Sequence, residues 1–218
     1  MNSTADVIVI GGGIMGASAA FRLAERGLKV TLVEKSFLAG GSTGKSSAII
    51  RQHYSNEITA RMALYSLRVF QNFSESVGDE CGYTPVGFVV LASARDREGL
   101  AANVALQQGI GINTRLLSPE ELREVAPGMA EAEAVAAAYE PEGGYADPAL
   151  TVSAFGAAAK RYGATILQET EVIGLKMEGD RVKGIVTNRG EIAAGAVVNT
   201  AGPWGARVAH MAGIELPI

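Results

Sequence analysis

The feature that most constrains this chain is a glycine-rich turn near its start, set between an apolar run and an amphipathic segment. Residues 6–10, DVIVI, form a short β-branched run, which favours a strand buried on both faces of a parallel sheet. Residues 14–26 place apolar side chains at helical spacing, and residues 28–34, LKVTLVE, predict a second strand. The order strand, helix, strand predicts a βαβ unit and therefore an α/β fold.

The turn carries the spacing Gly11-x-Gly13-x-x-Gly16, and Glu34 ends the following strand. In such a unit the first glycine permits a tight turn, the second lets a pyrophosphate approach the backbone, and the third lets the helix pack against the strand. The helix N-terminus offers free N–H groups to phosphates. An acidic residue at the end of the second strand accepts hydrogen bonds from a ribose and repels a 2′-phosphate. The pattern therefore predicts a dinucleotide site and disfavours an NADP-type ligand.

A second glycine-rich segment, AGGSTGKSS at residues 39–47, nearly spells a P-loop. A P-loop directly follows a buried strand and opens a helix, but here residues 35–38 intervene and the segment SAIIRQHYS that follows looks extended. An NTPase also needs an apolar strand that ends in Asp to hold Mg²⁺, and neither GFVVLAS nor AVVNTAG ends in Asp. The segment is better explained as a second wrap around an extended, doubly phosphorylated cofactor, to which it offers the hydroxyls of Ser42, Thr43, Ser46 and Ser47.

Composition and charge argue against nucleic-acid binding, membrane spans and metal sites. The 218 residues suffice for one large domain or one domain with part of a second, and the net charge of −4 gives no electrostatic case for nucleic acid. No uninterrupted apolar run reaches the roughly 18 residues of a membrane span, and no cationic leader precedes the first apolar run. The single cysteine fits a reducing compartment, and no Cys/His cluster has metal-ligand spacing. We expect a cytoplasmic protein without a metal site, a nucleic-acid partner or a membrane partner.

The rest of the chain alternates helical and extended patterns. Periodicity predicts helices at residues 55–77, 96–108, 150–162 and 204–212, and strands at 84–91, 135–140, 164–168 and 196–199. Turn signals at residues 178–180 and 188–190 predict a small meander. Ser118, Pro119 and Glu121 form a typical helix start.

These motifs, in this order, resemble the D-amino-acid oxidase superfamily of flavoenzymes. The stretch EKSFLAGGSTGKSSAIIR, residues 34–51, is most similar to the branch of sarcosine oxidase β subunits, dimethylglycine dehydrogenases and glycine oxidases. The resemblance covers essentially the whole chain. It implies a Rossmann-like FAD-binding domain of the glutathione-reductase type with part of a second, α+β substrate domain. By this resemblance the discontinuous FAD-binding domain spans residues 1–80 and 141–218, and the partial substrate-binding domain spans residues 81–140.

The resemblance also implies the cofactor and its contacts. FAD is expected without a covalent link, because Lys45 stands where some members carry a flavin-linking His. Carried over by position, Arg51 and His53 are the expected catalytic residues: Arg51 steers a carboxylate or stabilises negative charge on the reduced ring, and His53 relays a proton. Cofactor contacts are expected at Gly11, Gly13, Ile14, Met15, Gly16, Glu34, Lys35, Ser42, Thr43, Ser46, Ser47, Val172, Ala201, Gly202 and Trp204.

The family oxidises the C–N bond of amines and amino acids by hydride transfer to the flavin. The implied function is therefore oxidation of a small secondary amine or amino acid of the sarcosine or glycine type. Because members are much longer than 218 residues, we expect this chain to be an N-terminal portion of such an enzyme. One alternative is an FAD-binding module without catalysis, which associates with itself or with other oxidase subunits through its sheet edges. The other is an NAD-dependent dehydrogenase, which the GGSTG loop and the TAGPW turn argue against.

Overall fold

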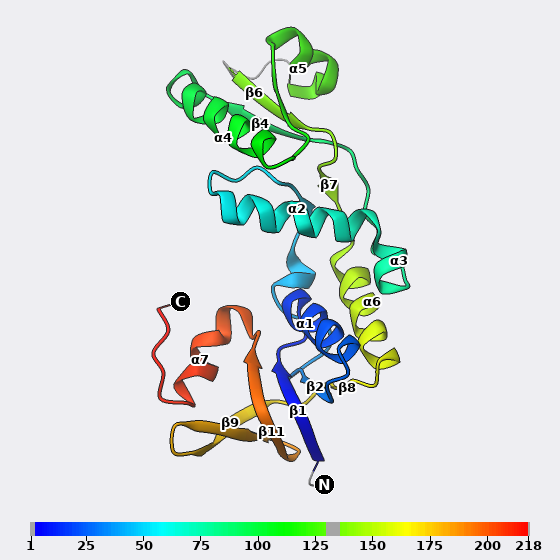
Figure 1. The fold of residues 1–218 in the computed structure, drawn as a ribbon, viewed down its shortest axis with the longest axis vertical. Coiled ribbons are helices and arrows are strands. Elements are labelled where there is room, and N and C mark those ends of the chain that lie inside the picture. Colours follow the sequence, from blue (N-terminus) through cyan, green and yellow to red (C-terminus); the bar gives the residue numbers. More distant parts are fainter. Residues whose placement is uncertain (1–2, 130–135, 218) are drawn as a thin grey trace. The chain divides into compact units, whose positions relative to one another are not determined.

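The computed structural model describes residues 3–129 and 136–217 and divides into two compact units. Unit 1 comprises Met1–Ser47, Val77–Cys81 and Asp147–Ile218, and unit 2 comprises Ala48–Ser76 and Gly82–Ala146. Figure 1 labels their helices and strands. The division expected from the sequence differs for residues 48–76 and 141–146, which group with unit 2, and for Cys81, which groups with unit 1.

Unit 1 is built on one six-stranded sheet in the order β8-β2-β1-β11-β10-β9. The first four of these strands run parallel, and β9, β10 and β11 form an antiparallel meander. This parallel sheet confirms the α/β class. The strands are β1 (Ser3–Ile10), β2 (Val30–Val33), β8 (Thr165–Leu167), β9 (Val172–Glu178), β10 (Arg181–Thr187) and β11 (Gly190–Asn199).

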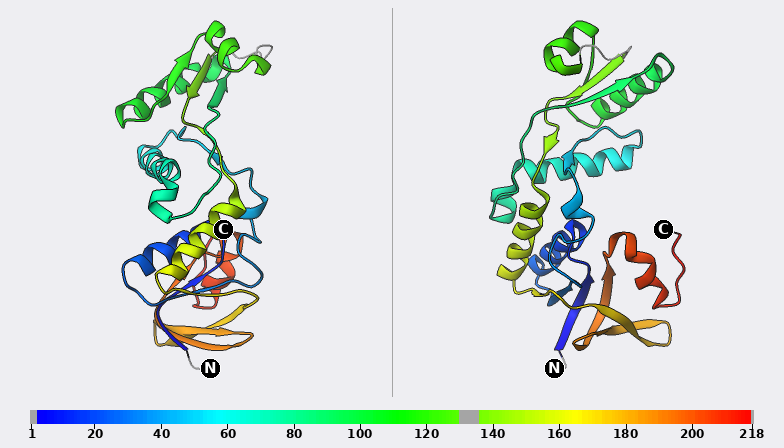
Figure 2. Two further views of the ribbon diagram at one scale, coloured as in Figure 1. Left: turned by 90° about the vertical axis from the view of Figure 1, so that its right-hand side faces the viewer. Right: turned by 180° about the vertical axis from the view of Figure 1, so that it is seen from behind.

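Both faces of this sheet are covered at its centre. The apolar runs of β1 and β2 therefore lie there. Ile8 and Val9 in β1 are fully buried, and all four residues of β2 are buried. Helices α1 (Ile14–Glu25) and α6 (Pro148–Arg161) lie side by side, with the Phe21 and Phe155 rings 5.8 Å apart between centroids (Figure 2). Unit 1 also contains η1 (Thr43–Lys45), η4 (Gly202–Trp204) and α7 (Gly205–His210), while α3 (Phe73–Val77) belongs to unit 2 except for its last residue.

Two predicted elements differ from the structure. The strand expected at residues 196–199 is the end of β11, a ten-residue strand whose register with β1 runs from Ser3↔Ile192 to Ile10↔Asn199. The small and polar residues of GEIAAG concealed its first half. The helix expected at residues 55–77 is two helices, α2 (Glu57–Gln71) and α3, because Asn72 ends the first one and its side-chain amide donates to the Arg68 carbonyl at 2.8 Å.

Unit 2 contains an antiparallel sheet in the order β4-β6-β5, with two helices packed on it. The predicted capping box at Ser118 and Glu121 is present at the start of α5. Val135, the expected first residue of β6, lies outside the described residues. The elements are β3 (Ile49–Ile50), β4 (Phe88–Ala92), η2 (Ala94–Asp96), α4 (Arg97–Gly109), β5 (Arg115–Leu117), α5 (Pro119–Val125), η3 (Pro127–Met129), β6 (Ala136–Glu140) and β7 (Gly144–Tyr145). In the described part of the chain, no helix has both the length and the apolar character needed to cross a membrane.

The position of α1 on the sheet depends on Gly16. A Cβ atom at Gly16 would overlap the carbonyl oxygen of Gly11 and would lie 2.8 Å from Oγ1 of Thr200. Backbone atoms cannot move aside as a flexible side chain can. The third glycine of the motif is therefore required for packing between helix and strand, as its spacing predicts.

We predict that Gly16→Ala lowers the free energy of unfolding of unit 1 by about 3 kcal/mol, because the added methyl group forces α1 away from β1. Urea unfolding followed by circular dichroism measures this difference. Gly195→Ala in β11 is the matched control, since its Cβ would meet only the Asp6 carbonyl oxygen at an ordinary 3.6 Å. Equal stabilities of the two variants would show that the close approach at Gly16 is not needed.

Candidate functional site

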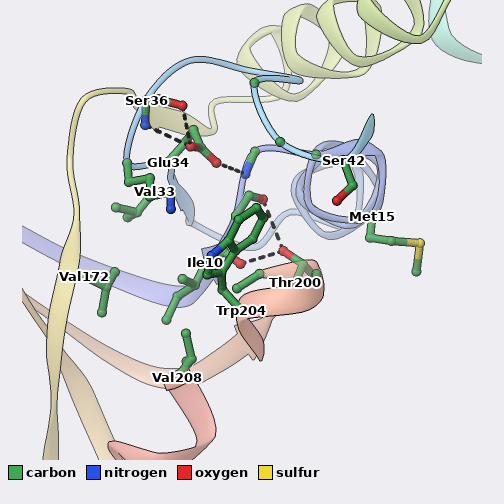
Figure 3. A pocket seen from close by; sticks show the side chains of 18 of the residues that line it. Ile10, Met15, Val33, Glu34, Ser36, Ser42, Val172, Thr200, Trp204 and Val208 are labelled. Carbon is green, nitrogen blue, oxygen red and sulfur yellow. Dashed lines mark hydrogen bonds between the residues drawn. The ribbon is translucent and has the colours of Figure 1, made fainter. Parts of the chain in front are cut away.

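A cavity of about 410 Å³ lies in unit 1 at the carboxyl ends of the parallel strands. Its lining includes Ile10 at the end of β1, Val33 at the end of β2, and Thr200 directly after β11. Open α/β sheets bind their ligands at this edge. In Figure 3, Val172 and Val208 lie at one end of the cavity and Met15 and Ser42 at the other, so the cavity has an apolar end and an end beside the start of α1.

The turn between β1 and α1 presents backbone amides to this cavity. Gly11 adopts a φ of 112°, and a Cβ there would come within 2.5 Å of the Thr200 carbonyl oxygen. Gly13 is the N-cap of α1, which receives no side-chain cap there and has no acidic residue in its first turn. The start of this twelve-residue helix therefore carries a partial positive charge that no acidic residue of its own first turn offsets, as an anion-binding N-terminus does.

Glu34 fixes this turn from the neighbouring strand. Its Oε2 accepts a hydrogen bond from the Gly12 amide at 2.7 Å, and its Oε1 accepts from the Ser36 amide at 2.8 Å and from the Ser36 hydroxyl at 3.1 Å. The spacing in the sequence predicted a ribose contact for Glu34 but gave no sign of this structural role. A carboxylate has about four acceptor positions, so the bonds to Gly12 and Ser36 leave acceptor capacity for a ligand hydroxyl.

The AGGSTGKSS segment folds back onto the same turn. The Ala39 amide donates to the Gly12 carbonyl at 2.9 Å, the Gly44 amide donates to the Ala39 carbonyl at 3.0 Å, and Ala39 has a φ of 62°. Thr43 Oγ1 accepts from the Ile14 amide at 3.1 Å. These bonds turn the segment into a strap over the start of α1. The segment contains only the short 3₁₀ turn η1, and β3 follows it where a P-loop would open a helix.

Trp204 and Lys35 lie together at the cavity. The Lys35 ammonium is 4.5 Å from the centroid of the Trp204 ring, a cation–π distance. Asn199 shapes the preceding turn: its amide nitrogen donates to the Gly205 carbonyl at 2.8 Å, and its oxygen accepts from the Ala201 amide at 3.2 Å. The role of Asn199 was not predicted, because a polar residue at the end of a strand has no distinctive spacing.

The structure brings most of the predicted cofactor contacts together around this cavity. Gly16, Ser46 and Ser47 are not among its lining residues. Residues of α7 and its C-cap, Met211, line the cavity as well, and the sequence analysis did not predict them. The available signal was the spacing of Arg207 and Met211, which lie four residues apart on one helical face. The predicted residues that do line it are Gly11, Gly13, Ile14, Met15, Glu34, Lys35, Ser42, Thr43, Val172, Ala201, Gly202 and Trp204.

The two predicted catalytic residues, Arg51 and His53, belong to unit 2 and are described there by themselves. The Arg51 guanidinium lies 5.5 Å from the centroid of the Tyr54 ring and 5.7 Å from that of Phe88. None of the ion pairs between described residues involves Arg51. This guanidinium thus lies against aromatic rings, and no carboxylate of the described residues pairs with it within 4 Å.

His53 lies beside a buried carboxyl group. Its Nδ1 is 3.8 Å from Oε1 of Glu140, whose side chain is 1% exposed, and Glu140 Oε2 accepts from the Gln52 amide at 2.8 Å. Burial lowers the pKa of His53, and the charge of Arg51 lowers it further. Burial raises the pKa of Glu140, against the opposing effects of the Gln52 amide and Arg51. Within the residues described, no three His, Cys, Asp or Glu side chains gather as metal ligands do.

Comparisons with known proteins cover nearly the whole chain. The family model described as FAD dependent oxidoreductase matches residues 6–218. Human mitochondrial sarcosine dehydrogenase is 30% identical over 224 aligned residues, which cover 99% of this chain and 24% of that protein. Sarcosine oxidase subunit beta of Rhodobacter capsulatus is 30% identical over 98% of this chain and 53% of that protein.

A solved structure shares the fold throughout. L-proline dehydrogenase from P. horikoshii superimposes with a TM-score of 0.93 at 36% identity, covering 100% of this chain and 58% of that one. The chain therefore spans between about a quarter and about three fifths of the length of these three relatives.

We predict that Thr43→Val lowers the free energy of unfolding of unit 1 by about 1 kcal/mol, because the Ile14 amide at the start of α1 loses its acceptor. Thermal or urea unfolding measures the change. Thr43→Ser keeps the hydroxyl and serves as the control. A Val variant as stable as the Ser variant would rule out the contribution of this bond.

Proposed function

Because the chain belongs to the family of FAD-dependent oxidoreductases, we propose that its unit 1 holds FAD in the cavity described above, without a covalent link. We further propose that the chain forms part of an enzyme that oxidises the C–N bond of a small secondary amine or amino acid. Unit 1 then corresponds to the discontinuous FAD-binding domain, and unit 2 to part of the substrate domain.

The residues around the cavity fit this cofactor. A cavity of about 410 Å³ falls within the range of about 300–1,000 Å³ that is usual for ligand sites. At Gly41 a Cβ would meet a Trp204 ring atom at 3.7 Å, so the glycines of the strap leave room for a ligand beside the indole. The start of α1, where Gly13 offers no side-chain cap, suits the two phosphates, and the acceptor capacity of Glu34 suits a ribose.

When bound, FAD supplies an isoalloxazine ring that accepts a hydride from the carbon next to nitrogen. The residues of this chain bind and orient. Among the lining residues, the backbone at Gly13 and Met15 and the hydroxyls of Ser42 and Thr43 would hold the phosphates and the ribityl chain, and the Val172 backbone would hold the adenine. Ser46 and Ser47, which do not line the cavity, stay predicted contacts.

Arg51 supports the assignment of the substrate class. A guanidinium held by Tyr54 and Phe88 and free of any carboxylate partner among the described residues is suited to bind a carboxylate in two-point fashion. Small amino acids such as sarcosine, glycine and proline carry that group, and sarcosine and L-proline appear in the names of the relatives. We therefore propose an amino acid with a free carboxylate as the substrate.

A second candidate is an FAD-binding module without catalysis of its own. The observation that favours it is coverage, since the chain spans 24% of sarcosine dehydrogenase and 53% of the sarcosine oxidase subunit. Association with other oxidase subunits or with a second copy belongs to this candidate. A cytoplasmic location is part of both proposals and is supported by the presence of a single cysteine, Cys81, which is buried and cannot form a disulfide within the chain.

We predict that the protein takes up FAD and that Glu34→Arg weakens FAD binding roughly tenfold to a hundredfold, because an acceptor of ribose hydrogen bonds is replaced by a cation. Titration of FAD fluorescence measures the affinity. Glu25→Arg makes the same charge change on α1, away from the cavity lining, and is expected to bind FAD normally. Equal affinity of both variants would contradict the role of Glu34.

We predict that Arg51→Ala raises the sarcosine concentration needed for half-maximal flavin reduction on the order of 100-fold, because the substrate carboxylate loses its charged partner. Stopped-flow absorbance of the flavin measures this. Arg51→Lys should recover only part of the loss, since an ammonium cannot form the two-point contact. An unchanged concentration dependence in Arg51→Ala would remove Arg51 from the substrate site.

A further inference from the structure

A buried polar cluster lies in unit 2 where the segment after β3 meets the end of β6. Its members are Gln52, His53 and Glu140; Gln52 and Glu140 are each 1% exposed. Glu140 is the last residue of β6 and is in register with Phe88 of β4. The backbone amide of Gln52 donates to Glu140 Oε2 at 2.8 Å, so this carboxyl group fixes the chain between Arg51 and His53.

Two atoms of the cluster face each other without a hydrogen bond. His53 Nδ1 and Glu140 Oε1 are both buried, both lack a partner, and lie 3.8 Å apart. Buried polar atoms in native proteins almost always have a partner. A gap about 1 Å longer than an ordinary hydrogen bond closes by a small side-chain rotation. The geometry is that of a donor–acceptor pair held ready to share a proton.

The charges around the pair allow that proton to move. Burial raises the pKa of the Glu140 carboxyl and lowers the pKa of the His53 imidazole, so the two groups approach each other in proton affinity. Arg51 lowers the pKa of both groups. The other charged groups nearby are engaged elsewhere, since Glu142 accepts from Gln71 Nε2 at 2.7 Å, and Arg115 on β5 lies over the Tyr139 ring and is paired with Glu121.

We propose that His53 is neutral and Glu140 ionised at rest, that His53 accepts the proton that an amine substrate loses while Arg51 holds its carboxylate, and that His53 and Glu140 then share that one proton. The second half of this proposal rests on the proposed function. Glu140 is a positioning residue, because it acts through His53 and through the Gln52 amide.

The proton step balances without an oxidant. An N–H bond of the substrate ammonium breaks, its electron pair stays on nitrogen, and an N–H bond forms on the imidazole of His53. The lone pair on nitrogen is needed because an ammonium cannot form a C=N bond when hydride leaves the neighbouring carbon. The negative charge of Glu140 stabilises the resulting imidazolium, and the proton returns to water after the product leaves.

The chain offers a direct test because it contains two histidines, His53 and the exposed His210. Side-chain NMR of histidine-labelled protein gives both titration midpoints, assigned with His210→Ala. We expect Glu140→Gln to lower the His53 midpoint by about one pH unit, because the imidazolium loses its anionic partner, and to leave His210 unchanged. Glu140→Gln keeps an oxygen that accepts from the Gln52 amide. The matched control, Glu142→Gln, should not move the His53 midpoint.

An unmoved His53 midpoint in Glu140→Gln would overturn the shared proton. If that variant does not fold, the wild-type protein decides instead: the Glu140 carboxyl carbon and the His53 ring should report the same midpoint, and independent midpoints would overturn the pair. Neither measurement requires FAD or activity.

The acceptor role is tested by stopped-flow reduction of FAD-loaded protein with sarcosine as the probe. His53→Gln should slow reduction on the order of 100-fold near neutral pH and flatten its pH dependence, while the FAD content stays equal to that of the wild type. An unchanged rate and pH profile would overturn the acceptor role. If the wild-type protein reduces with no amine at all, the proposed function and the acceptor role both fail, and the NMR midpoints still decide the shared proton.

Discussion

Unit 1 depends on the close approach of three backbone segments at the carboxyl end of β1. Thr200, which follows β11, donates its hydroxyl to the Ile10 carbonyl at 2.8 Å, and the Gly11 carbonyl lies where a side chain on Gly16 would have to fit. The strap enters the same region through the bond from the Ala39 amide to the Gly12 carbonyl. Since the cavity is bounded by these same atoms, its shape follows from the packing of the sheet and not from flexible side chains.

Two glutamates serve a similar purpose in the two units. Glu34 accepts the Gly12 amide from a turn that faces the cavity, and Glu140 accepts the Gln52 amide from the segment that carries Arg51. In both cases a carboxylate at the end of a strand holds the backbone of a neighbouring segment by a charge-assisted hydrogen bond. The difference is burial. Glu140 is almost inaccessible and faces His53, which adds proton chemistry to a structural contact.

The sequence predicted the first βαβ unit, the strap and the meander because short-range patterns determine them. Hydrophobic periodicity and glycine spacing act within a few turns of chain, and Gly11, Gly16 and Ser118 have roles that follow from local sterics and capping. The extent of β11, the structural bonds of Glu34 and Asn199, and the pairing of His53 with Glu140 depend on residues far apart in the chain. Residue spacing cannot predict these features, because each one forms only when separate segments of the chain meet.

The register between β1 and β11 has a consequence for how such a chain assembles. One edge of β1 pairs with β2, which lies close to it in the sequence. The other edge pairs with residues 192–199. While the chain is being synthesised, that edge stays open until residues 192–199 have left the ribosome, and an open strand edge is a template for wrong pairing. Contacts between residues far apart in the sequence form slowly, and the pairing of β1 with β11 is such a contact. The cavity between these strands is thus among the last parts of unit 1 to form, although its glycine-rich turn is among the first residues made.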